Sequence, residues 1–129
     1  MRIRIAAVAA VAALGATGAA IGVVSAASAA AKADPTLIGK VGINNAFVIT
    51  LKSSAGKKVK TLKSGFYKLK VTDGSDIHNF QIEGPGLDKR VTTVGFKGTK
   101  TVRVHFRKGK YKFYCMPHES SMFGFFKVT

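Results

Sequence analysis

The sequence has no tryptophan, three prolines, three histidines and a single cysteine. One cysteine excludes a disulfide within the chain, so the thiol must pair with another chain, stay free or bind a ligand. Three histidines are too few for an enzyme that holds several metal ions through imidazole. Acidic residues are also scarce: 6 Asp and Glu stand against 21 Lys and Arg, and the formal net charge is +15. The length of 129 residues is enough for one domain of modest size.

The first 33 residues differ in composition from the rest. A short basic start, Met1–Arg4, precedes an uncharged Ala- and Val-rich run, and small-x-small cleavage signals follow at 27–29 and 31–33. We therefore predict a secretory signal peptide over 1–33 and an exported domain over 34–129, periplasmic or extracellular. The alternative is an uncleaved membrane anchor, because the uncharged run is long enough to span a bilayer. Without the three basic residues of this segment, 18 basic and 6 acidic residues remain, a net charge of +12.

The remaining sequence predicts strands, because no segment keeps helical periodicity over three turns. Residues 66–72 alternate between apolar side chains and lysines, and residues 101–106 alternate in the same way. Further strands are expected at 36–41, 47–51, 59–62, 78–82, 91–94, 111–115 and from 123 onward. Short strands at near-regular spacing, separated by glycine-rich turns, are typical of an all-β sandwich.

The residues able to bind a metal concentrate in one short stretch, YCMPHESSM at 114–122. It holds Cys115, His118 and Met122, and soft sulfur ligands together with imidazole select copper over hard cations. His78, which follows a strand-like run, supplies a second imidazole. Two histidines and a cysteine with a weak axial methionine form a blue-copper electron-transfer site. Zinc fits less well, because a thioether is a poor zinc ligand.

Each of these residues has an ordinary structural explanation when it is considered alone. Cys115 would be an inert buried thiol, Met122 would pack in the core, and His78 would be a hydrogen-bonded strand residue. Their joint order and spacing favour the copper site. The third histidine, His105, falls on the outward side of its strand between arginines and is expected to be an ordinary surface residue.

At these residues the sequence resembles the cupredoxins, most closely the plastocyanin and amicyanin type. The likeness covers nearly all of 34–129 and is carried by HNF at 78–80, GKYKFYCMPH at 109–118 and MFGFFKV at 122–128. It implies a Greek-key β-sandwich that binds one copper ion as Cu(II) or Cu(I). By this resemblance His78, Cys115 and His118 are the equatorial ligands and Met122 is the weak axial one. Three residues separate His118 from Met122, one fewer than in plastocyanin and one more than in amicyanin.

Two neighbours of the ligands are expected to support them. Pro117 narrows the conformations of the loop, and Asn79 is expected to orient that loop or to hydrogen-bond the thiolate.

The function expected from this site is one-electron transfer between redox proteins. The alternative is copper binding and delivery, although the chain has no methionine-rich tract. An enzyme is not expected, because protein ligands fill all four positions, and a metal-free binding module would normally lack a ligand. The lysines predict redox partners with acidic surfaces, or association with an anionic membrane or cell wall. Nucleic acid is not expected, because an exported protein rarely meets it. A monomer is expected.

Overall fold

The computed structural model describes Gly18 and residues 32–129 of the chain. The chain divides into two units, Met1–Ala31 and Lys32–Thr129, and the second contains every described strand. The predicted signal peptide therefore lies almost wholly outside the described residues. Among the residues that are described, none forms a helix both long and apolar enough to cross a membrane.

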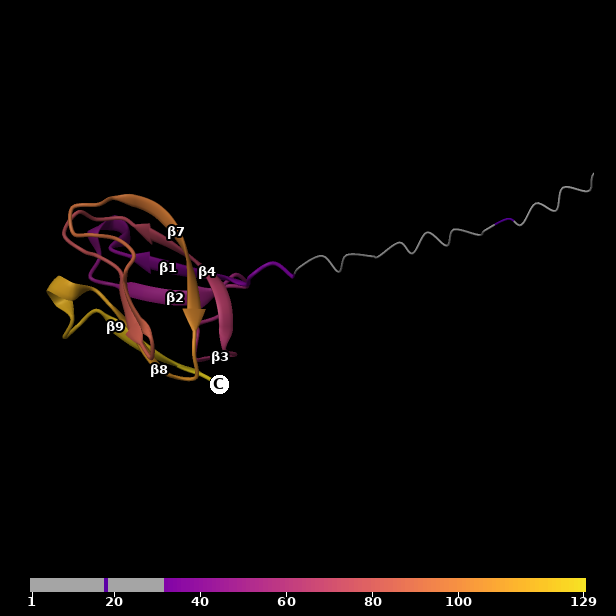
Figure 1. Cartoon of the computed structure of the whole chain (residues 1–129). Helices are drawn as coiled ribbons and strands as arrows, with labels where there is room; N and C mark the ends of the chain where they lie inside the picture. Colours follow the sequence, from indigo (N-terminus) through magenta and orange to yellow (C-terminus); the bar gives the residue numbers. More distant parts are fainter. Residues whose placement is uncertain (1–17, 19–31) are drawn as a thin grey trace, which may run out of the picture. The chain divides into compact units, whose positions relative to one another are not determined.

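Two sheets form the domain, and the predicted all-β sandwich is confirmed (Figure 1). The four-stranded sheet has the order β2 (Ile49–Ser53), β1 (Thr36–Val41), β4 (Gly65–Asp73), β7 (Gly98–Phe106). The five-stranded sheet has the order β3 (Thr61–Leu62), β9 (Phe123–Val128), β8 (Gly109–Tyr114), β5 (Gln81–Gly84), β6 (Leu87–Arg90). Both sheets are mixed, because β1 pairs parallel with β4 and β3 pairs parallel with β9.

The core lies between the sheets and follows the predicted alternation. On β4 the side chains of Tyr67, Leu69 and Val71 are buried, while the two lysines between them are exposed. Aromatic rings fill the centre, where Tyr111 stacks on Phe126 with a centroid distance of 5.3 Å. Burying a large apolar side chain contributes about 1.5–3 kcal/mol. Every core residue that the structure describes lies within 32–129, so this compact unit has a hydrophobic core of its own.

The prediction of a strand at 91–94 is wrong. The strand in this region is β6, which ends at Arg90 and pairs antiparallel with β5. Val91 and Thr92 are buried in a loop, and their N–H groups both donate to the Phe80 carbonyl, at 2.9 and 3.3 Å. Residues 91–94 therefore form a loop that is buried at Val91 and Thr92 and exposed at Val94, and they do not join a sheet.

Three other strands begin later than the sequence predicts, and the first of them, expected at 59–62, is strand only at Thr61–Leu62. The run 47–51 becomes strand only at Ile49, because the Val48 carbonyl accepts a hydrogen bond from the Gly42 N–H at 3.1 Å within a loop. In the run 78–82 only the last two residues belong to β5. Phe47 and His78, which the last two of these strands leave outside, both lie at the candidate site.

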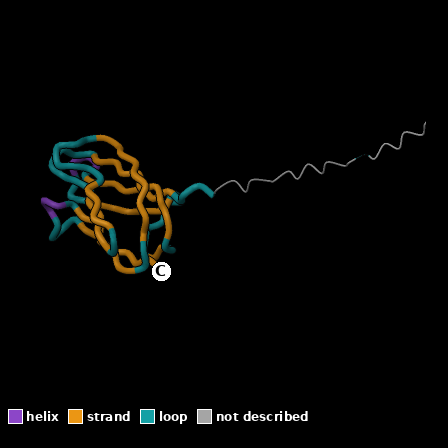
Figure 2. The backbone as a smooth tube through the Cα atoms, in the orientation of Figure 1, coloured by secondary structure: helices purple, strands orange, loops and turns teal. Residues whose placement is uncertain are grey.

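The candidate site lies at one end of the sandwich. Figure 2 shows two short helical segments at that end, at the left of the view, and the C-terminus at the other. They are the 3-10 turns η1 (Ile43–Asn45) and η2 (Met116–His118). The loop that contains η2 joins β8 to β9, as the sequence predicts, and begins directly at Cys115.

Candidate metal centre

Three of the predicted ligands come together although they are distant in sequence. The Nδ1 atoms of His78 and His118 lie 3.1 Å apart, and the Cys115 Sγ lies 3.6 Å from each of them. His78 comes from the connection between β4 and β5, and the other two come from the β8–β9 loop. His78 and Cys115 are fully buried, and His118 is half-buried.

This triangle has the size that a metal ion requires. Metals bind imidazole nitrogen at about 2.0–2.1 Å and thiolate sulfur at about 2.3 Å, as zinc sites illustrate, so two donors on one ion stand roughly 3–4 Å apart. Edges of 3.1, 3.6 and 3.6 Å meet this condition. Two imidazoles and a thiolate in a trigonal set are the equatorial donors of a type 1 copper site.

Met122 is tied to the same loop through its backbone. Its carbonyl accepts the Cys115 N–H at 3.0 Å, and its own N–H donates to the His118 carbonyl at 2.8 Å. The residue is only 1% exposed. A buried thioether on a residue whose backbone is hydrogen-bonded to two expected equatorial ligands is consistent with an axial donor. This role of Met122 stays a prediction, which substitution of the residue tests.

The two expected supporting residues occupy different positions. Asn79 is buried, and its Oδ1 accepts the Met116 N–H at 2.7 Å, which joins the two ligand-bearing segments. Pro117 lies in the first turn of η2 and is exposed. Asn79 therefore holds the loop in place through its Oδ1, which is the first of the two roles expected for it.

A buried polar network fixes the segment that carries His78. The Thr92 hydroxyl donates to Asp73 Oδ2 at 2.7 Å and accepts the Phe80 N–H at 2.8 Å, while Asp73 Oδ1 accepts the Ser75 N–H at 3.2 Å. All of these side chains are buried. The network ties the end of β4 to both sides of His78. No local pattern predicts it, because its members are distant along the chain.

The titratable groups near the cluster favour neutral imidazole. Burial lowers the pKa of His78, and the nearby His118 lowers it further. Metal ligands must be deprotonated to bind, so a neutral imidazole supports metal binding.

Two further groups near the site also have shifted pKa values. Burial raises the pKa of Asp73, against the opposing effect of the Thr92 hydrogen bond. Burial and the neighbouring Glu83 raise the pKa of Tyr114 to about 12.

Phe47 contacts both histidines, which sequence reasoning missed. Its ring centroid lies 4.8 Å from each imidazole in an edge-on arrangement, yet the side chain is 57% exposed. The sequence placed it in a strand, where it would have been a core candidate. Phe47 instead covers the outer side of the two imidazoles at the protein surface.

Gly42 supports His78 from the other side. It has a φ of 62°, and a Cβ placed there would lie 2.7 Å from His78 Cδ2 and 2.7 Å from Ser75 Cβ. Both the left-handed backbone and the close approach of the ring require glycine. The sequence indicated a turn here but not its contact with a ligand.

We expect Gly42→Ala to displace the His78 ring and to lower copper affinity by roughly tenfold to a hundredfold, the usual cost of disturbing a residue that orients a ligand. Gly56→Ala is the matched control, because Gly56 also has a positive φ, of 82°, but a Cβ there meets nothing within 4 Å. Competition with a copper chelator measures both variants. Equal affinities for the two would contradict the assigned role of Gly42.

His105 lies apart from the cluster, as expected. It is exposed on the outward face of β7, and its ring lies 4.5 Å from that of Phe66. It contributes nothing to the candidate metal site.

The fold is that of the cupredoxins, with the histidine–cysteine–histidine cluster at one end of the sandwich. Solved structures of rusticyanin match it: a methionine-to-glutamine variant has a TM-score of 0.52 and 18% identity, over 73% of this chain and 76% of that one. Reduced rusticyanin matches with a TM-score of 0.51 and 19% identity, over 73% and 78%. A further structure, of the copper protein rusticyanin, has a TM-score of 0.51 and 16% identity, over 73% and 76%. No protein-family model matches the sequence, and no curated protein does.

Proposed function

We propose that this protein is an exported type 1 copper protein that carries single electrons between redox partners. The observation that carries the proposal is the compact triangle of two Nδ1 atoms and one thiol sulfur, with edges of 3.1 and 3.6 Å. Its donor chemistry selects copper. The rusticyanin structures of the same fold, one of them named as a copper protein and one as reduced, support the choice.

Bound copper would supply the one-electron couple, and the chain supplies a fixed geometry around it. Cys115 directly follows the last residue of β8, and its N–H donates to the Met122 carbonyl at the other end of the loop. Asn79 holds the loop to the His78 segment. Donors held in place by packing and hydrogen bonds change little with oxidation state, so little reorganisation accompanies electron transfer.

The exposed edge of the site suits contact with a redox partner. Phe47 and Met116 are 57% and 45% exposed beside His118, which is itself half-buried. The positive charge of the domain would steer partners with acidic surfaces toward it, and salt would screen this attraction. The same partly open edge also keeps copper delivery as the second candidate, because a recipient protein could approach His118.

We expect the copper-loaded domain to give reversible one-electron voltammetry and to keep its copper through repeated reduction in the presence of a Cu(I) chelator. The fixed donor set holds both oxidation states, whereas a delivery protein must release the ion. Copper content and visible absorption after each cycle measure this. Rapid loss of copper on reduction would favour delivery over electron transfer.

Export forms part of the proposal and rests on the composition of residues 1–33. We expect mass spectrometry of the natural protein to find an N-terminus near Ala30 or Asp34 in the periplasmic or secreted fraction. Recovery of the chain from Met1 in membranes would instead support an uncleaved anchor.

A further inference from the structure

The outward face of the four-stranded sheet carries a second feature, unconnected with the metal ligands. The sheet register places the outward residues in rows across the strands. One row runs from Lys52 through Ile38 and Lys70 to Thr101, and the next pairs Lys68 with Arg103. An isolated bridge from Lys52 to Lys58 extends the first row beyond the edge strand.

This face is cationic over its whole width. Its exposed basic residues come from β1, β2, β4, β7 and the adjoining turn, and they are Lys40, Lys52, Lys58, Lys68, Lys70 and Arg103. The one carboxylate beside them, Asp34, is paired with Arg103 at 2.7 Å. Arg103 also lowers the pKa of Asp34 through that hydrogen bond. Asp34 and Arg103 therefore cancel each other's charge, and the five lysines carry the net positive charge of this face.

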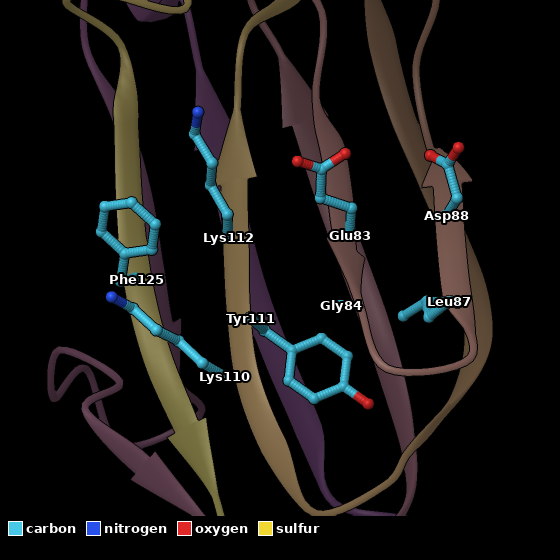
Figure 3. Close-up of a pocket in the computed structure, with 8 residues that line it drawn as sticks. All are labelled: Glu83, Gly84, Leu87, Asp88, Lys110, Tyr111, Lys112 and Phe125. Carbon is cyan, nitrogen blue, oxygen red and sulfur yellow. The ribbon is translucent and has the colours of Figure 1, made fainter.

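The five-stranded sheet differs in its charge pattern. Figure 3 shows Glu83 and Asp88 on neighbouring strands beside Lys110 and Lys112. Lys112 is paired with Glu119 at 2.7 Å. Its outward face thus mixes both signs, so the net charge of the domain is not spread evenly over its two faces.

Protection of sheet edges does not account for the cationic face. Lysines on edge strands discourage pairing with other sheets, but Lys40, Lys68 and Lys70 lie on β1 and β4, the two central strands. Like charges directly opposite across a strand pair, such as Lys52 and Lys58, also cost stability. A face kept cationic at this cost indicates an anionic partner.

We propose that this face docks flat against an anionic lipid bilayer. Lysines provide point charges without directional geometry, which suits a fluid layer of headgroups better than one defined ligand. Phe66, 45% exposed, stands at the end of the face with the Arg103 guanidinium 3.9 Å from its ring, and Phe is among the side chains that interfacial amphipathic helices bury at the headgroup boundary. The face contains none of the four candidate copper ligands, so docking leaves the metal end free, and the inference does not rest on the redox function.

The test uses residues 32–129, so that the apolar leader does not contribute. Sedimentation with vesicles of equal parts phosphatidylcholine and phosphatidylglycerol, against phosphatidylcholine alone, measures binding at low and high salt. A variant with four Lys→Gln substitutions, at Lys40, Lys52, Lys68 and Lys70, removes most of the positive charge of this face. A charge-matched control changes Lys60, Lys89, Lys110 and Lys127, all exposed and on the side of the other sheet. Thermal unfolding confirms that both variants are folded.

We expect salt-sensitive binding to the anionic vesicles alone. Each lysine near the surface is worth about fivefold in partitioning, so removal of four should weaken binding by up to several hundredfold, and the control should lose much less. The Cys115→Ser protein should bind like the unaltered domain, since the copper site is not involved. Equal losses in both variants would show that net charge alone acts and would overturn the proposal. Absence of vesicle binding, with retained binding of an acidic protein that the face variant loses, would overturn it in favour of a protein partner.

Discussion

A Cys115→Ser variant is expected to show no intense visible colour with copper(II). The colour of a type 1 site arises from charge transfer from thiolate to copper, and a serine hydroxyl is a hard, poorly ionised donor. Cys115 is the only cysteine in the chain, so no other thiol can replace it. Visible absorption of the variant and the unaltered domain at equal copper concentrations measures the effect, and essentially all of the band should disappear.

The control for this result is Met116→Leu. Met116 is adjacent in sequence and carries sulfur, but it is 45% exposed and its Sδ accepts a hydrogen bond from Arg90 Nη2 at 3.2 Å. Its replacement should leave the colour in place. Because Cys115 is fully buried, urea unfolding must show that the serine variant is folded. A folded Cys115→Ser protein with an undiminished band would place the chromophore elsewhere.

The second large effect is expected at Met122, where the donor atom should set the reduction potential. A thioether supports Cu(I) better than Cu(II), and an axial bond is long and weak. Met122→Gln introduces a harder oxygen, which should favour Cu(II), lower the potential and shift the visible bands. Met122→Leu removes the donor and should raise the potential. Each tenfold change in relative affinity shifts a one-electron potential by about 59 mV, so shifts on the order of 100 mV are expected.

Voltammetry and the visible spectrum measure these variants, with Met116→Gln as the exposed control. Copper should remain bound throughout, because His78, Cys115 and His118 are unchanged. Since Met122 is buried, exchange for leucine should cost less than about 1.5 kcal/mol of stability. If potential and spectrum stay unchanged in both variants, Met122 is a packing residue and the axial position is empty or otherwise filled.

The strands that sequence reasoning located well are those with one buried and one solvated face. β4 and the second half of β7 alternate between apolar and polar residues, and this period is local information. β6 was missed because its four residues are mostly exposed and polar. The parallel pairing of β1 with β4 depends on contacts between distant segments, which no local pattern specifies.

The candidate site also has a part that the local sequence predicts and a part that depends on tertiary structure. The order and spacing of Cys115, His118 and Met122 were visible because one loop carries them. His78 could be proposed from its residue type, but its convergence depends on the Asp73–Thr92 network and on Gly42. Phe47 was placed in a strand because its neighbours are β-branched, and only tertiary structure puts its ring against both imidazoles.

The central claim is that His78, Cys115 and His118 form one copper site with thiolate ligation. Titration of residues 32–129 with copper(II), followed by visible absorption, tests it most directly. We expect an intense thiolate-to-copper charge-transfer band whose absorbance rises linearly and stops increasing at one equivalent of copper per chain. Stoichiometric binding without such a band, or absorption that does not saturate, would contradict it.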